Sequence, residues 1–454
     1  MIPGSSPGTV SGVRPFGVKP FGRTSFGVDK WAHAFISTWK TDNLGSSNDN
    51  QITLPLSVNP VAIYVSWGDG SYSHITAYDQ ADKTHTYAAS ETYTVKIVGT
   101  LKGFQFNDGG DKLKLTEISQ WGCFDFTETA VFYGAANLDI VATDVPAITT
   151  TDFTELFYDC ATITSFETSL INLFLSIILT DASDMFTGVT LDTDIYDAFI
   201  TGWDATGIIN IHLGGGNATY SLEAAAAHAT LITDGWTITD GGSELGVIVD
   251  WWRIETGITK DGSDDVSQFK GSINSIDLDA AGAARPRWTA AQINGQPAIV
   301  FAAADHMQGL FGATYTQPNT VIIVHKEGTL TYRSVFGGAT AGFSNALFTW
   351  NDSYALLASV HKDSDILMEA RWSIISCVFN RASSVIRKNG VAGTLPAGDI
   401  GAMTLTGLTI GDNANLTAPS DISVTDVIVV NGAMTTAQLE NVEAYLNALR
   451  GGIY

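Results

Sequence analysis

The chain has 454 residues, which is enough for about three domains. It is 45% hydrophobic and 15% charged and contains 45 glycines, a composition that favours β-structure with many turns. The net charge of −24 disfavours nonspecific binding to nucleic acid, and no apolar stretch reaches the ~18 residues that a membrane helix needs.

The first residues lack a positively charged segment followed by an apolar one, so we expect no secretory signal. A protein of this kind stays inside the cell, leaves it by another route, or is released by lysis, as a virion protein is. The three cysteines, Cys123, Cys160 and Cys377, form no CxxC motif and no paired framework. We expect them to be small buried hydrophobic residues and not disulfide partners.

Residues 1–45 are predicted to form an extended arm. Three pentads within residues 14–28 each place a Phe before a Gly, and a period of five fits neither a helix nor a strand. Residues 1–40 hold five basic residues and one acid, whereas residues 115–252 hold 20 acids and no Lys or Arg. We expect the arm to order on a negatively charged partner. Its docking residues are Arg14, Phe16, Lys19, Phe21, Arg23 and Phe26. The alternative is a disordered leader on a body whose acidic surface serves solubility.

Residues 46–105 are predicted to form strands over 51–56, 62–67, 74–77 and 92–98. A Trp-Gly-Asp-Gly turn begins at Trp67, and His85 and Tyr87 follow it. This pattern resembles a PKD-type β-sandwich. We interpret Asp69 as a turn residue that bonds its own backbone, and the alternative is a metal ligand.

Residues 106–245 contain degenerate repeats. Phe132, Phe157 and Phe186 begin similar segments at spacings of 25 and 29 residues, within the range of leucine-rich repeats. The region resembles the BspA-like leucine-rich repeats of bacterial and phage surface proteins. That resemblance implies a short solenoid in which the Phe and Leu or Ile side chains of one coil stack on those of the next. The apolar stretch 170–179 is expected to cover an end or to make a contact.

Residues 246–454 carry two apolar stretches, 320–325 and 372–379, that are typical of buried strands. Asn389-Gly390 is a hairpin turn signal, and residues 435–449 form an amphipathic helix with one apolar face. In order and spacing these features resemble a LamG-like, concanavalin A-like jelly roll. The predicted fold class is therefore mainly β and multidomain: a PKD-like sandwich, a short leucine-rich-repeat-like solenoid and a C-terminal jelly roll.

A glycan site needs an exposed aromatic face beside fixed polar groups. The candidates in the jelly-roll region are His306, Tyr332, Trp350, Asn351, Asp352 and Tyr354. The alternative for each is packing in the core or in a turn. Asp261, Asp264 and Asp265 form the densest acidic loop, which makes calcium the only candidate cofactor; an exposed acidic loop is the alternative.

The sequence shows no catalytic motif. A nucleophile elbow, a zinc-binding HExxH and a phosphate-binding glycine loop at a helix start are all missing, and so is the paired-acid strand of jelly-roll glucanases. We therefore expect no enzyme activity.

The three resemblances together are typical of structural or adhesion proteins of tailed phages. They imply a non-catalytic protein on the virion surface, a head fibre or decoration protein attached to the capsid. Its arm would bind other virion proteins, and its LamG-like domain would bind a host glycan or protein. We expect a homo-oligomer with no nucleic acid and no membrane insertion. The alternatives are a tail fibre or receptor-binding protein, a bacterial cell-surface adhesin, and a polysaccharide depolymerase.

Overall fold

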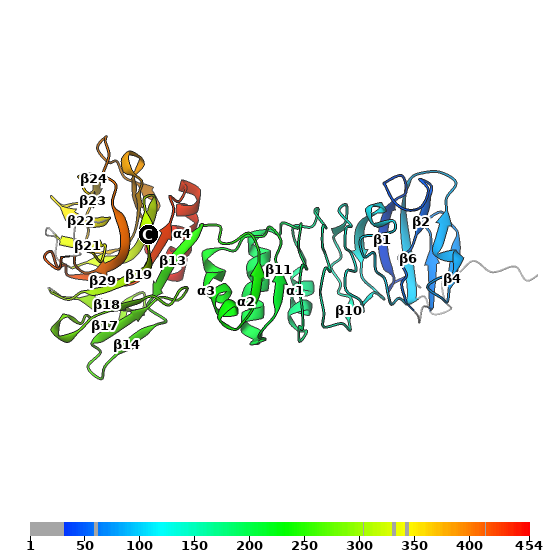
Figure 1. The fold of residues 1–454 in the computed structure, drawn as a ribbon, viewed down its shortest axis with the longest axis horizontal. Helices are drawn as coiled ribbons and strands as arrows, with labels where there is room; N and C mark the ends of the chain where they lie inside the picture. The colour runs from blue at the N-terminus through cyan, green and yellow to red at the C-terminus, as the bar shows by residue number, and fades with distance from the viewer. Residues whose placement is uncertain (1–30, 59–61, 303, 329–332, 341–344, 414) are drawn as a thin grey trace, which may run out of the picture. The chain divides into compact units, whose positions relative to one another are not determined.

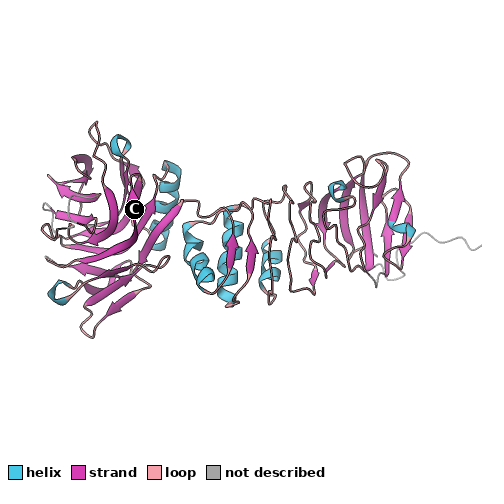
Figure 2. Ribbon diagram, viewed as in Figure 1, coloured by secondary structure: helices cyan, strands magenta, loops and turns pink. Residues whose placement is uncertain are grey.

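The computed structural model describes residues 31–454 except 59–61, 303, 329–332, 341–344 and 414. The described residues are mainly β (Figure 2), and the chain divides into two compact units, Met1–Phe174 and Leu175–Tyr454. The predicted fold class is thereby confirmed. Four short 3₁₀ helices, η1 to η4, lie in connections: Ala81–Lys83, Lys112–Lys114, Gly282–Ala284 and Arg381–Ser383. No helix within the described ranges is long and apolar enough to cross a membrane.

The first unit begins with a six-stranded sheet in the order β4-β3-β6-β1-β7-β9. Figure 1 labels β1, β4 and β6 of this sheet. Its strands are β1 Phe35–Lys40, β3 Ala62–Ser66, β4 Tyr72–Ile75, β6 Thr92–Thr100, β7 Leu115–Gln120 and β9 Asp139–Ile140. A second, two-stranded sheet pairs β2 Gln51–Thr53 with β5 Thr84–Thr86. Trp39, Trp67 and Val95 are fully buried in this part of the chain.

Strand β1 corrects the predicted extent of the arm. We expected an extended segment up to residue 45, but β1 pairs with β6 on one side and β7 on the other. Phe35 and Trp39 are fully buried there. Long-range pairing stabilises this strand, and the local sequence around it does not indicate a strand. The predicted docking residues of the arm, all before residue 31, lie outside the described residues.

The Trp-Gly-Asp-Gly segment forms a turn in which Asp69 is a turn residue, as predicted. The Asp69 carboxylate accepts a hydrogen bond from the Ser71 amide at 2.9 Å and lies 2.8 Å from His85 Nε2. Burial opposes the charged form, but the bonds from Ser71 and His85 outweigh it and lower the pKa of Asp69 to about 2. His85 stacks on Trp67 at 4.9 Å, and the Tyr87 hydroxyl donates to the Trp67 carbonyl.

The repeats of the first unit form coils with short parallel pairings. Strand β8 Asp125–Phe126 pairs in parallel with β10 Ala147–Ile148. The Phe132 amide donates to the Leu156 carbonyl of the next coil, and the Phe132 and Phe157 rings stack at 5.7 Å. The predicted stacking of repeat Phe residues is therefore observed for this pair. Helix α1, Thr168–Leu175, forms from the apolar stretch and buries Leu170, Ile171 and Phe174.

The second unit begins with two helix-containing coils. They comprise α2 Thr193–Thr206, β11 His212–Gly214, α3 Leu222–Thr233 and β12 Thr237–Thr239, and β11 and β12 pair in parallel. Ser221 caps α3 by accepting a hydrogen bond from the Glu223 amide. Trp203 on α2 packs against Trp236 before β12, with ring centroids 5.8 Å apart. An aromatic core thus holds these coils together.

The remainder of the second unit is a two-sheet sandwich. One sheet has the order β17-β18-β29-β20-β25-β26-β27, with β13 also paired to β29. Its strands are β13 Val247–Arg253, β17 Arg287–Ile293, β18 Gln296–Phe301, β20 Asn319–Glu327, β25 Trp372–Phe379, β26 Val385–Lys388, β27 Val391–Ala392 and β29 Ile422–Asn431.

The other sheet has nine strands in the order β14-β15-β16-β19-β28-β21-β22-β23-β24. They are β14 Ile258–Lys260, β15 Val266–Lys270, β16 Asp277–Asp279, β19 Met307–Thr316, β21 Arg333–Gly337, β22 Ala346–Trp350, β23 Ser353–Leu357, β24 His361–Leu367 and β28 Thr404–Ile410. The predicted buried strands 320–325 and 372–379 are confirmed as β20 and β25.

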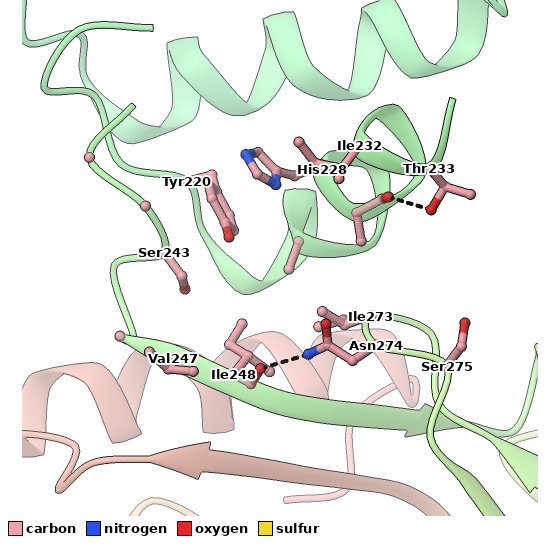
Figure 3. A pocket seen from close by; sticks show the side chains of 15 residues that line it. Tyr220, His228, Ile232, Thr233, Ser243, Val247, Ile248, Ile273, Asn274 and Ser275 are labelled. Carbon is pink, nitrogen blue, oxygen red and sulfur yellow. Dashed lines mark hydrogen bonds between the residues drawn. The ribbon is translucent and has the colours of Figure 1, made fainter. Parts of the chain in front are cut away.

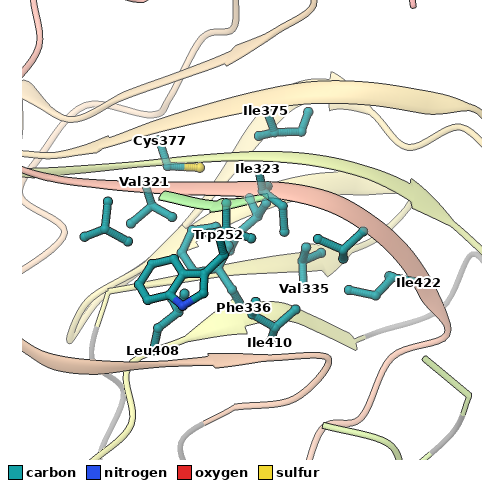
Figure 4. Close-up of a cluster of buried hydrophobic side chains, with 14 of the residues drawn as sticks. Trp252, Val321, Ile323, Val335, Phe336, Ile375, Cys377, Leu408, Ile410 and Ile422 are labelled. Carbon is teal, nitrogen blue, oxygen red and sulfur yellow. The ribbon is translucent and has the colours of Figure 1, made fainter. Parts of the chain in front are cut away.

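The main core lies between these two sheets (Figure 4). Alternate residues of β20 divide between two cores: Val321 and Ile323 face the other sheet, while Ile322 and Val324 face the opposite way. Cys377 is part of the inner core, and Cys160 is buried as well, as predicted; Cys123 is only partly buried. All three thiols are free.

Helix α4, Thr436–Leu449, covers the second face of the β20 sheet with Leu439, Val442 and Leu446. The predicted packing of this helix is confirmed. Leu222 and Ala225 of α3 join the same cluster, so the coils and the sandwich share a core within the second unit. Behind α4, the buried Arg450 guanidinium contacts Asp426 at 2.6 Å and also pairs with Glu255.

Candidate functional site

The hairpin between β22 and β23 presents Trp350. Asn351 and Asp352 have φ angles of 47° and 63°, the left-handed conformation that a two-residue hairpin turn requires, and both residues are exposed. Trp350 ends β22 and is 38% exposed. Asn and Asp adopt this conformation more readily than other residues with a side chain, which explains the turn from the sequence.

Strand alternation places Trp350 on the outer face of the nine-stranded sheet. Leu347 packs into the core between the sheets, whereas Phe348 belongs to a separate cluster on the opposite face. Trp350 has the same parity as Phe348 and therefore points outward. Its ring lies edge to face against His361 of β24, with centroids 5.5 Å apart. His361 Nε2 lies 3.1 Å from an Asp363 carboxylate oxygen. The outer face thus combines an aromatic ring, an imidazole and a carboxylate.

Tyr354 does not belong to this surface, and its prediction as a ligand-binding residue is wrong. It is 1% exposed and packs in the core between the sheets. Its hydroxyl lies 3.2 Å from His325 Nε2, which in turn lies 3.2 Å from a buried Glu327 carboxylate oxygen. The two-residue turn fixes the register, so that Ser353 points outward with Trp350 and Tyr354 points inward.

Two further candidates are not brought to the Trp350 hairpin. Tyr332 lies outside the described residues. His306 is half-buried and immediately precedes β19, and β28 and β21 lie between β19 and β22 in the sheet. Three inter-strand spacings of about 4.8 Å therefore separate β19 from β22.

The acidic loop at Asp261, Asp264 and Asp265 is occupied by contacts within the protein. Asp261 accepts hydrogen bonds from the amides of Ser263 and Asp265, and these bonds lower the pKa of its carboxyl group. Arg285 lies 3.3 Å from Asp261, and Lys260 pairs with Asp264. Within the part of the chain that the structure describes, no three His, Cys, Asp or Glu residues are grouped to hold a metal ion. Calcium binding here stays a prediction.

Sequence reasoning missed a cavity of about 710 Å³ in the second unit (Figure 3). Helix α3 forms one wall, and the start of β13 with residues 273–275 forms the other. Its polar lining consists of Tyr220, His228, Thr233, Ser243, Asn274 and Ser275. The lining segments are up to 55 residues apart in the sequence, so no local motif indicates that they form a cavity together. The nearest signal was Gly241-Gly242 at the end of the repeats, where the chain turns beside the cavity.

A chain of contacts fixes the aromatic end of this cavity. The Tyr220 and His228 rings stack at 4.2 Å, and His228 Nε2 lies 3.2 Å from Asp240. Asp240 also accepts hydrogen bonds from the Tyr196 hydroxyl and the Gly242 amide. Burial opposes the charge on Asp240, but its close contact with His228 and its hydrogen bonds from Tyr196 and Gly242 outweigh burial and lower its pKa.

No protein-family model matches the chain, and no curated protein matches it. Solved structures match part of it. A Trypanosoma rangeli sialidase in complex with the inhibitor DANA is 10% identical, with a TM-score of 0.30; the match covers 43% of this chain and 32% of the sialidase. Domain 4 of AbnA, a GH43 extracellular arabinanase from Geobacillus stearothermophilus, in complex with arabinotriose, is 13% identical, with a TM-score of 0.33, over 43% of this chain and 98% of that domain.

The binding domain of botulinum neurotoxin serotype D is 7% identical, with a TM-score of 0.33, over 44% of this chain and 51% of that one. The match spans about a third of the sialidase and about half of the toxin domain. Similarity at this level assigns no residue and no activity to this chain.

Proposed function

We propose that this chain is a non-catalytic glycan-binding protein whose binding surface is the outer face of the nine-stranded sheet around Trp350. The observation that carries the proposal is the exposed Trp350 ring, held at a hairpin tip beside His361. A Trp on a tight hairpin loses little conformational freedom on binding, because the turn and the neighbouring ring already restrict it.

The chemistry of the surface suits a sugar ring. The apolar C–H face of a sugar packs on an aromatic face, and its hydroxyl groups need fixed donors and acceptors at the rim. Asp363 supplies a carboxylate acceptor, and His361 supplies a ring N–H or a ring nitrogen acceptor. Hydrogen bonds to a charged group are stronger than neutral ones, so Asp363 would fix the orientation of a hydroxyl.

The local charge narrows the ligand class. Asp352 in the hairpin turn and Asp363 of β24 are both exposed, and their negative charge disfavours the approach of anionic polymers. Neutral glycans therefore fit this surface better than sialylated or uronate-rich ones.

A glycan array tests the proposal, with the full-length protein compared with Trp350→Ala. Loss of a stacking ring should weaken binding at least tenfold, which is about 1.4 kcal/mol. Leu310→Ala is the matched control, because Leu310 is a 67% exposed apolar residue on β19 of the same sheet. Binding that is equally strong in Trp350→Ala would contradict the site, and release of reducing ends from a bound polymer would contradict the non-catalytic part.

We further propose that this binding takes place at the surface of a phage particle. The chain's three sequence resemblances support display on a phage virion, with the N-terminal arm bound to a capsid or tail protein. Immunogold labelling of purified particles with an antibody against residues 246–454 is the direct test. Labelled particles would support this setting, and a protein found only on the bacterial envelope would favour an adhesin.

A further inference from the structure

We propose that the cavity between α3 and the start of β13 is a second ligand site, which takes an uncharged sugar residue. The site is separate from the Trp350 surface and does not rest on it. It is built by residues 220–233 and 241–248 and by the loop 273–275. A volume of about 710 Å³ lies within the range of about 300–1,000 Å³ that is typical of small-molecule sites.

Exposed apolar side chains line both walls. Ile232 of α3 is 47% exposed and Val247 of β13 is 59% exposed, although both lie beside a well-packed core. Figure 3 shows Ile232 on the α3 side and Val247 on the β13 side of the cavity. Large aliphatic residues left open to solvent on both sides of one cavity indicate a surface that an apolar ring face can cover.

Tyr220 is held rigidly at the cavity. Its ring stacks on His228, its amide donates to the Gly242 carbonyl, and its carbonyl accepts from the Glu244 amide. Burial, with a contribution from the Asp240 charge, raises the pKa of the Tyr220 hydroxyl, so the hydroxyl stays protonated and can donate a hydrogen bond. A preorganised aromatic ring with a polar tip is suited to binding a polyhydroxylated ligand.

The remaining polar groups offer both kinds of hydrogen-bonding partner. The Thr233 hydroxyl already donates to the Ala229 carbonyl, which leaves its oxygen as an acceptor. The Ser243 hydroxyl accepts from the Leu245 amide, which leaves its proton to donate. The Asn274 side chain donates through Nδ2 to the Ile248 and Val249 carbonyls, and these bonds do not use its amide oxygen. Sugar hydroxyl groups donate and accept at once, and so match such a mixed set.

The lining favours an uncharged ligand. Among the described residues that line the cavity there is no Asp, Glu, Lys or Arg. His228 lies beside the Asp240 carboxylate, so any positive charge on its ring is compensated within the protein. A ligand with a carboxylate or an ammonium group would lose hydration here without gaining an opposite charge. A neutral monosaccharide, or the neutral end residue of a glycan, is therefore the class that fits.

The test uses saturation-transfer NMR and calorimetry on the full chain that carries Trp350→Ala, so that the first surface is removed. The probes are glucose, galactose, rhamnose and N-acetylglucosamine, with glucuronate as the charged comparison. Ala229→Trp then fills the cavity from α3. Thr230→Trp is the matched control, because Thr230 is the next residue of the same helix, is exposed and does not line the cavity.

We expect at least one neutral sugar to bind Trp350→Ala, with binding at least tenfold weaker after Ala229→Trp is added and unchanged after Thr230→Trp. Tyr220→Phe should weaken binding while keeping the ring. Should Ala229→Trp fail to fold, Val247→Trp fills the cavity from the opposite wall at an exposed strand end. Absence of neutral-sugar binding in Trp350→Ala, binding unaffected by filling the cavity, or a preference for glucuronate would each overturn the inference. The first of these results, with glycan binding by the unmodified chain intact, would leave the proposed function standing.

Discussion

Replacement of Trp236 by Ala should destabilise the helix-containing coils strongly. Trp236 is 3% exposed, its ring packs 5.8 Å from Trp203, and its indole N–H donates to the Ile208 carbonyl at 2.7 Å. A buried aromatic side chain covers about 150–250 Å², which corresponds to about 4–6 kcal/mol at about 25 cal/mol per Å². That figure is an upper bound, and Trp-to-Ala substitutions in cores cost about 3–5 kcal/mol. We expect a loss of about 4 kcal/mol in unfolding free energy.

Hydrogen exchange is the suitable assay, because multidomain chains seldom unfold in one step. The amides of α3 and β12 should exchange faster in Trp236→Ala by a factor that corresponds to this loss, while those of the six-stranded sheet stay unchanged. Trp236→Phe is the control that keeps an aromatic ring but removes the indole N–H and part of the buried ring volume, and it should cost less than Trp236→Ala, about 1–3 kcal/mol. Unchanged protection of α3 and β12 in Trp236→Ala would refute the assigned packing role.

Three further predictions concern the ends of the chain and its ionised groups. The pKa of Asp69 is about 2 in the folded state, below its usual 3.8. Its contribution to the stability of the first unit is therefore present above about pH 4 and is lost as the pH falls toward 2. Acid titration of the melting temperature should show this dependence, and Asp69→Asn should reduce it. Arg450→Met should destabilise the two-sheet sandwich by about 3–5 kcal/mol in chemical denaturation, because it leaves the buried Asp426 carboxylate without its cation. The double variant Arg450→Met with Asp426→Leu should recover part of that loss. No recovery would contradict an electrostatic origin of the loss. If the arm anchors the protein to a virion as proposed, deletion of residues 1–28 should abolish incorporation into particles and leave the circular dichroism of the body unchanged. Normal incorporation would contradict the proposed anchoring role.

Prediction from the sequence worked best where short-range patterns decide structure. The Trp-Gly-Asp-Gly turn, the Asn389-Gly390 hairpin between β26 and β27, and helix α4 each follow from local conformational preference or from periodicity, and each could be predicted from a few residues. It failed for β1, whose strand character depends on pairing with β6 and β7, segments more than 50 residues further along the chain.

The sequence by itself determined the mainly β class, the repeats, the buried strands β20 and β25, and the presence of an aromatic and polar cluster around Trp350. Only the tertiary structure decided which members of that cluster face solvent, because the register of β22 and β23 sends Trp350 outward and Tyr354 into the core. The cavity beside Tyr220 also depends on the tertiary structure, since packing of α3 on the sandwich brings its two walls together. The sequence gives the type of each side chain, but its spatial neighbours are determined by contacts between residues that are far apart in the chain.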